Sequence, residues 1–142
     1  MEDCKVEWTV RAIRGAITVN SNTVEGIREA VTELLDALEQ GNQLDTENII
    51  SATFSVTRDL DAIFPAAIAR KRPKWENVEL LDVQHMHVKD GLEHCIRFLI
   101  HVNLPVSQPI YHPYLREAHN LRPDRSLSAP GSPSTPGIHS SK

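Results

Sequence analysis

The chain has 142 residues, of which 40% are hydrophobic, and a formal net charge of -4. This length fits one domain with a core of its own, and the acidic balance argues against nucleic acid or an anionic membrane as a partner. The N-terminus lacks the basic start of a signal peptide, and no apolar run approaches the roughly 20 residues of a membrane span. We expect a cytoplasmic protein with one domain at residues 1–122 and a disordered Pro/Ser-rich tail at 123–142.

The first predicted element is a strand over residues 7–19 that carries a charge on its apolar side. Residues two apart share a strand face, which places Arg14 in line with Trp8, Val10, Ala12 and Ala16. A buried guanidinium keeps its proton, so it needs either a structural carboxylate partner or an anionic ligand. Arg97 interrupts a second apolar strand in the same way. The two arginines indicate one anion-binding pocket, and structural ion pairs are the alternative.

A helix follows the first strand. Asn22 and Glu25 have the spacing of an N-cap and a returning carboxylate, and Gly41 offers a stop. Between them the apolar residues recur at helical intervals and predict one buried stripe. These residues are Val24, Ile27, Val31, Leu34, Leu35 and Leu38.

The remaining elements predict a small mixed sheet of the α+β class. Ile50, Ala52, Phe54 and Val56 alternate with polar residues and predict a strand, and Pro65 begins a short helix that ends before Pro73. A third strand within residues 78–88, a last long strand at 95–102 and a helical piece at 115–120 follow. Two helices cover one face of such a sheet, so we expect another copy of the chain to cover the other face.

Few residues offer conventional catalytic chemistry. His85 and His87 lie on one side of a strand and with His94 or His101 form a candidate zinc site, although two surface histidines are the alternative. Cys4 and Cys95 are too few for a disulfide framework, so both are interpreted as free thiols, with Cys95 a buried structural residue. No phosphate-binding glycine loop is present, and we expect neither a metal nor another cofactor.

Five motifs, taken in order along the chain, match one known family. They are residues 11–16 (RAIRGA), 51–53 (SAT), 64–66 (FPA), 95–97 (CIR) and the pair 114–115 (YL) with 121–124 (LRPD). This set resembles the monofunctional AroH-class chorismate mutases over residues 10–124. The resemblance implies a homotrimer that forms a pseudo α/β barrel, with active sites between subunits. It also implies the intramolecular rearrangement of chorismate to prephenate in phenylalanine and tyrosine biosynthesis.

The resemblance assigns roles to individual residues. It implies that Arg14 binds a substrate carboxylate, that Tyr114 holds the enolpyruvyl end, and that Arg97 bonds the ether oxygen as its bond to carbon breaks. The substrate-binding positions implied besides these are Phe64, Ala66, Arg70, Leu81, His85, Leu121 and Arg122. The family commonly has a cysteine followed three residues later by a glutamate, where this chain has Asp82 and His85. We hypothesise that Asp82 takes the role of that glutamate and that His85 gives a neutral hydrogen bond.

Three alternatives remain at this point. The first is a weakened or inactive homologue of the family. The second is an enamine/imine hydrolase of similar trimeric architecture, and the third is a non-catalytic binder of an aromatic-pathway metabolite. The hydrolases also grip a carboxylate with an arginine, but they do not require the second central arginine, Arg97.

Overall fold

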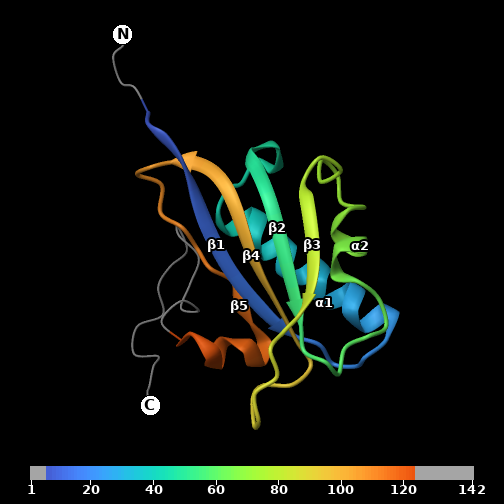
Figure 1. The fold of residues 1–142 in the computed structure, drawn as a ribbon. Helices are drawn as coiled ribbons and strands as arrows, with labels where there is room; N and C mark the ends of the chain where they lie inside the picture. The colour runs from blue at the N-terminus through green and yellow to red at the C-terminus, as the bar shows by residue number, and fades with distance from the viewer. Residues whose placement is uncertain (1–5, 124–142) are drawn as a thin grey trace.

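A computed structural model describes residues 6–123 as five strands with helices on one side (Figure 1). The strands are β1 (Trp8–Thr18), β2 (Ile49–Val56), β3 (Glu79–Gln84), β4 (Cys95–Pro105) and β5 (Tyr114–Leu115). The helices are α1 (Val24–Gly41) and α2 (Pro65–Ala69), with 3₁₀ turns η1 (Thr46–Asn48) and η2 (Arg116–Leu121). The predicted α+β class and order of elements are confirmed. The sequence pattern missed β5 and η1, which are short.

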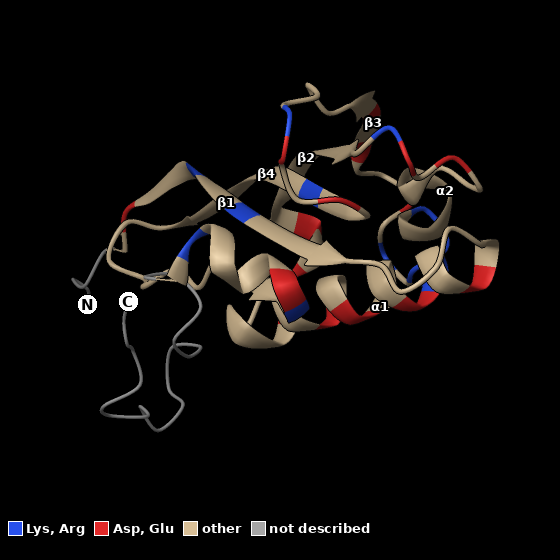
Figure 2. Cartoon of the chain, turned by 90° about the horizontal axis from the view of Figure 1, so that it is seen from below, with Lys and Arg blue, Asp and Glu red and all other residues tan. Residues whose placement is uncertain are grey.

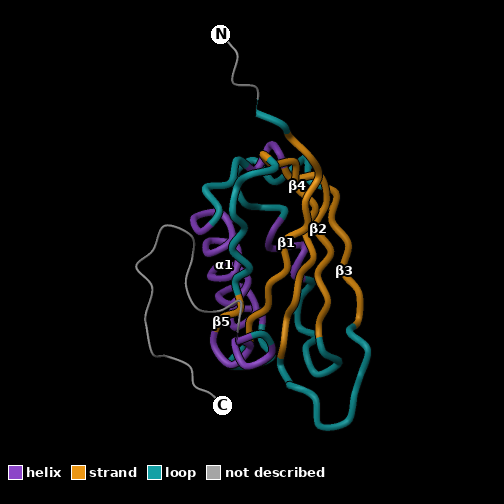
Figure 3. The backbone as a smooth tube through the Cα atoms, turned by 90° about the vertical axis from the view of Figure 1, so that its left-hand side faces the viewer, coloured by secondary structure: helices purple, strands orange, loops and turns teal. Residues whose placement is uncertain are grey.

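The sheet has the strand order β3-β2-β4-β1-β5. β4 pairs antiparallel with both β1 and β2, whereas β3 and β5 add in parallel at the two edges. Seen along the sheet edge, α1 lies on one side of the strands β1 to β3 and leaves their other side uncovered (Figure 3). The mixed sheet with helices on one face is therefore as predicted.

The core lies between the sheet and the apolar stripe of α1. Ile13 and Ile17 of β1 are fully buried, as are Leu34, Leu35 and Leu38 of the helix. The predicted cap of α1 needs a correction. Thr23 is the N-cap and its hydroxyl accepts from the Gly26 amide, because Asn22 instead bonds Asp61 and the amide of residue 62 in the loop before α2.

The alternation predicted for β2 breaks at its first residue. Ala52 and Phe54 are buried as expected, but Ile50 is exposed and Ile49 is buried in its place. The pairing of β2 with β4 shifts register between Ile49 and Ser51, and this irregularity turns Ile50 outward. The start of the strand could not be read from period-2 alternation alone.

The open face of the sheet corrects the expectation for Arg14. Trp8 and Val10, which share its face, are 51% and 55% exposed, and Arg14 is itself exposed. The core side of β1 carries Ile13 and Ile17 instead. The apolar line that suggested a buried face is therefore uncovered in the single chain from Trp8 to Ala12, and only Ala16 at its far end is buried.

Two expectations concern regions beyond the core. No helix within residues 6–123 is long and apolar enough to cross a membrane. The free thiol predicted at Cys4 and the predicted tail beyond Pro123 lie outside the described residues.

Candidate active site

The two arginines singled out by the sequence lie on neighbouring strands of the open face. In the antiparallel pairing of β1 with β4, Arg14 is opposite Leu99 and Arg97 is opposite Ala16. The two residues are therefore diagonal neighbours with side chains on the same face. Figure 2 shows basic residues within the sheet in this region. The two arginines share this face, but they do not share one pocket in the single chain. Arg14 lines a hollow with Leu99 and His112, whereas Arg97 lines another.

Arg97 is half-buried and has no carboxylate partner in the described part of the chain. Its Nε atom is buried and has no hydrogen-bond partner among the described residues. Asp59 lines the same hollow of about 250 Å³, but its carboxylate is already bonded to the Thr57 hydroxyl and to the His94 amide. Within residues 6–123 neither Arg97 nor Arg14 forms an ion pair, so a structural ion pair does not explain either charge.

Cys95 lies two residues before Arg97 on β4, and the guanidinium affects its thiol. Burial raises the pKa of the Cys95 thiol, while the charge of Arg97 and its hydrogen bond to the sulfur act against that rise. Cys95 is 1% exposed and is not part of a disulfide, as the sequence predicted for a structural cysteine. The contact of Cys95 with Arg97 was not predicted, although a spacing of two on a strand places both side chains on one face.

Tyr114 and Leu121 form an apolar floor beside the arginines. Tyr114 of β5 pairs with Ala16, and both belong to a small buried cluster with Cys95 and Ala118, against which Leu121 packs. Gly15 allows this approach, because a Cβ atom there would lie 2.7 Å from the carbonyl oxygen of Pro113 and 2.6 Å from the Phe98 ring. Arg122 follows η2 directly.

His112 lies beside Arg14 and was not predicted as part of the site. The Arg14 amide donates to Nδ1 of His112 at 3.0 Å, so the histidine side chain occupies a position that a strand partner would otherwise fill. The sequence offered no signal for this contact, because it joins residues 98 positions apart.

His85 faces the same hollow as Arg97. Burial and the nearby charge of Arg97 lower the pKa of His85 below its ordinary value. The imidazole is therefore neutral near pH 7 and can donate or accept one hydrogen bond without adding charge.

The other predicted residues gather around α2. Asp82 of β3 accepts a hydrogen bond from the Ala66 amide at 3.0 Å, in the first turn of the helix, and Phe64 before it is 69% exposed. Burial raises the pKa of Asp82, against the effects of the Ala66 amide and of the Arg70 charge. Phe64 and Asp82 line a hollow of about 550 Å³.

The structure thus divides the predicted residues into two groups. The arginine group consists of Arg14, His85, Arg97, Tyr114 and Leu121 and lies on the open face. The α2 group consists of Phe64, Ala66, Arg70 and Asp82. Leu81 is exposed on β3 between them, on the open face opposite Thr53. Asp82 and His85 line separate hollows of one chain.

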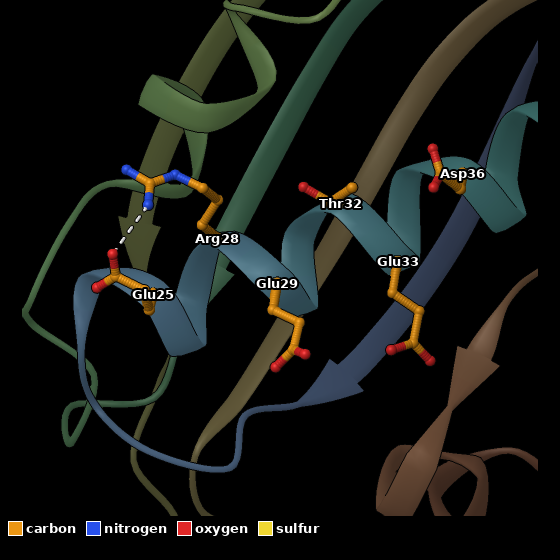
Figure 4. Close-up of a pocket in the computed structure, with 6 residues that line it drawn as sticks. All are labelled: Glu25, Arg28, Glu29, Thr32, Glu33 and Asp36. Carbon is orange, nitrogen blue, oxygen red and sulfur yellow. Dashed lines mark ion pairs between the residues drawn. The ribbon is translucent and has the colours of Figure 1, made fainter.

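Two other candidate sites are not favoured. A shallow hollow along α1 (Figure 4) is lined by four carboxylates, Glu25, Glu29, Glu33 and Asp36, with Arg28 and Thr32. Its charge repels an anionic ligand. The zinc site proposed for His85 and His87 is not formed, since residues 6–123 contain no cluster of three or more metal-ligating side chains.

Comparisons with known proteins agree on one family. The model of the family described as chorismate mutase type I matches residues 10–125. The chain is 38% identical to chorismate mutase AroH of Bacillus subtilis over 120 residues, covering 84% of this chain and 94% of that protein. It is 41% identical to chorismate mutase AroH of Thermus thermophilus over 117 residues, covering 81% and 95%. A solved chorismate mutase from Clostridium thermocellum superposes with a TM-score of 0.73 at 40% identity, covering 78% of this chain and 98% of that one.

Proposed function

This chain belongs to the type I chorismate mutase family, and we infer from that premise that it converts chorismate to prephenate. The enzyme is an isomerase of aromatic amino acid biosynthesis. The comparisons do not favour the hydrolase or the non-catalytic binder, since the relatives matched over most of their length are mutases. The observation that carries the mechanism is a pair of arginines on one sheet face that have no carboxylate partner within residues 6–123.

The reaction explains why this site needs so few chemical groups. A [3,3]-sigmatropic shift breaks a carbon–oxygen bond and forms a carbon–carbon bond within one molecule, and it requires no nucleophile or proton transfer. The protein contributes by fixing the reactive conformation and by placing charge where it develops. Chorismate carries two carboxylates, so it supplies the anion that the arginine group lacks.

Arg97 is the group that meets the developing charge. Its buried Nε–H has no acceptor within residues 6–123, and the ether oxygen becomes more negative as its bond to carbon lengthens. This interaction is stronger in the transition state than in bound chorismate, so it raises kcat. Arg14 binds a carboxylate from the exposed end of the same face, and Tyr114 fixes the enolpyruvyl end.

The ring of the substrate needs an electron-rich neighbour, because positive charge develops there. We assign this role to Asp82, whose Oδ1 is bonded to the Ala66 amide, and we assign a neutral hydrogen bond to His85. Phe64, Leu81 and Leu121 supply apolar walls. Arg70 and Arg122 lie toward the entrance, and Ala66 lines the wall at α2.

A homotrimer unites the two groups of residues. The open face exposes apolar side chains that a single chain leaves in water, among them Trp8, Val10, Leu81 and Val83. Their burial against a neighbouring copy favours assembly, at about 25 cal/mol for each Å² removed from water. In this arrangement the arginine group of one subunit and the α2 group of the next form one site.

The activity is tested by mixing the purified protein with chorismate. We expect loss of the ultraviolet absorbance of chorismate, with prephenate as the product, and a mass by light scattering of three times 15.9 kDa. A protein that leaves chorismate unchanged, although folded, contradicts the function.

The shared site is tested by subunit mixing. Arg97→Ala and Arg70→Ala each damage one group, so each homotrimer is impaired. Co-refolding the two variants gives mixed trimers in which some sites combine two intact groups, and kcat/KM at low chorismate rises above that of either parent. No rise in activity on mixing shows that each site is built within one subunit.

A further inference from the structure

The segment that carries two of the predicted binding residues is intrinsically weak. η2 is a six-residue 3₁₀ helix, and Leu115 at its N-cap gives no side-chain hydrogen bond. Runs of this length are uncommon because 3₁₀ hydrogen bonds have poor geometry. Leu121 ends η2 and Arg122 follows it, so their placement depends on what anchors the segment from outside.

The anchor is Arg116, the first residue of η2. Its Nε and Nη2 atoms donate to Oε1 of Glu33 on α1, at 3.2 and 2.7 Å, and its Nη1 donates to the carbonyl of Thr18 at 3.0 Å. The amide of Glu117 donates to the Thr18 hydroxyl at 3.2 Å. The arginine side chain is 21% exposed, so solvent screens the ion pair only in part. Figure 4 shows Glu33 projecting from α1.

The backbone of Arg116 shows that this contact is specific. Its φ of 55° lies in the left-handed region, which is costly for a residue with a side chain. From this conformation the guanidinium reaches Glu33 of α1 and Thr18 at the end of β1. Thr18 is the last residue of β1, whose earlier residue Ala16 belongs to the cluster that holds Ala118 of η2.

We propose that Arg116 is a positioning residue for the mutase reaction, which clips η2 to Glu33 and Thr18 and so holds Leu121 and Arg122 in place before chorismate binds. This inference rests on the proposed function. When only a fraction of the molecules is competent to bind, the apparent dissociation constant rises by the inverse of that fraction. Loss of the clip therefore raises KM and leaves the chemistry of the bound complex, which depends on Arg97, unchanged.

The experiment compares Glu33→Gln and Arg116→Gly with wild type and with Glu25→Gln. The control removes a charge from the first turn of the same helix, where Glu25 pairs with Arg28 at 3.6 Å. Arg116→Gly removes the clip but also relieves the left-handed backbone, so its melting temperature is expected to change little. We expect KM to rise about threefold to tenfold in both test variants, with kcat within about twofold of wild type.

Hydrogen exchange gives a second measurement that does not depend on activity. We expect peptides covering residues 115–123 of the free protein to exchange faster in the two test variants and at the wild-type rate in Glu25→Gln. An unchanged KM and unchanged exchange in both test variants overturn the clip. A fall in melting temperature and in kcat at constant KM shows a purely structural role, which also overturns it. An inactive wild type refutes the proposed function instead, and the exchange data still decide whether Arg116 orders η2.

Discussion

The two faces of the sheet are built from alternate residues of the same strands, yet they have opposite properties. On the helix-covered face, Ile13, Ile96 and Ile100 are fully buried in the main core cluster. Arg14 follows Ile13 in the chain and Arg97 follows Ile96, but both arginines lie on the open face. Neither has an ion-pair partner within residues 6–123. One face specifies the fold and the other is left with unsatisfied charge. Substitutions on neighbouring residues of β1 and β4 should therefore affect either stability or catalysis, but not both.

The largest effect is expected for Arg97→Lys. Lysine keeps the charge but loses the planar fork and the buried Nε–H, which has no partner in the described part of the chain. We expect kcat to fall about 10²–10³-fold, the range for removal of one transition-state hydrogen-bond donor. Stopped-flow or steady-state loss of chorismate absorbance measures this.

His101→Gln is the matched control on the same strand face, where the ring lies 3.4 Å from the Ser51 hydroxyl. Its kcat should equal that of wild type. Normal turnover by Arg97→Lys would show that the open-face arginine is not the catalytic cation.

A smaller effect is expected where the two groups of residues meet. If Asp82 provides the carboxylate for the substrate ring, Asp82→Asn lowers kcat by about tenfold to a hundredfold, as for loss of a hydrogen bond to a charged group. The amide can still accept from the Ala66 amide, so α2 stays in place. His85→Gln should cost less, since it replaces one neutral partner by another. Equal, small losses of kcat in the two variants contradict the hypothesis that Asp82 takes the role of the family's glutamate.

The covered face gives the complementary result. Ile96 is fully buried and precedes Arg97 in the chain, and Ile96→Val removes one methylene from the core. We expect the free energy of unfolding to fall by about 0.5–1.5 kcal/mol, measured by urea denaturation, while kcat stays at the wild-type value. A large loss of kcat here would show that the faces are not independent.

The same division decides what could be predicted from the sequence. The stripe of α1 and the alternation of β4 follow from burial periodicity, so these elements were predicted nearly to their ends. Arg14 was recognised as unusual, but for a wrong reason, because the apolar residues around it are an uncovered surface. A single sequence does not distinguish a core from an interface by alternation, since both bury the same side chains.

The remaining differences come from contacts between distant parts of the chain. Asn22 was available as a cap for α1, yet the loop before α2 takes its side chain. The separation of Asp82 from His85 is an exception that the sequence could have shown, because a spacing of three on a strand places two side chains on opposite faces. The role of Arg116 depends on a carboxylate 83 residues earlier in the chain. Local patterns do not report such partners.

The smallest effect is a pH dependence that belongs to the open face alone. Burial and the charge of Arg97 lower the pKa of His85 below 6.5, so the neutral imidazole persists to lower pH in the folded protein than in the unfolded chain. Protonation adds a cation near the substrate ring, where positive charge develops, and we expect kcat to decline only below pH 6.5. Because the unfolded chain takes up this proton first, the free energy of unfolding also falls as pH drops from 6.5 through the folded pKa. His85→Gln should remove both changes, and an activity profile that keeps the same inflection in this variant assigns it to another group.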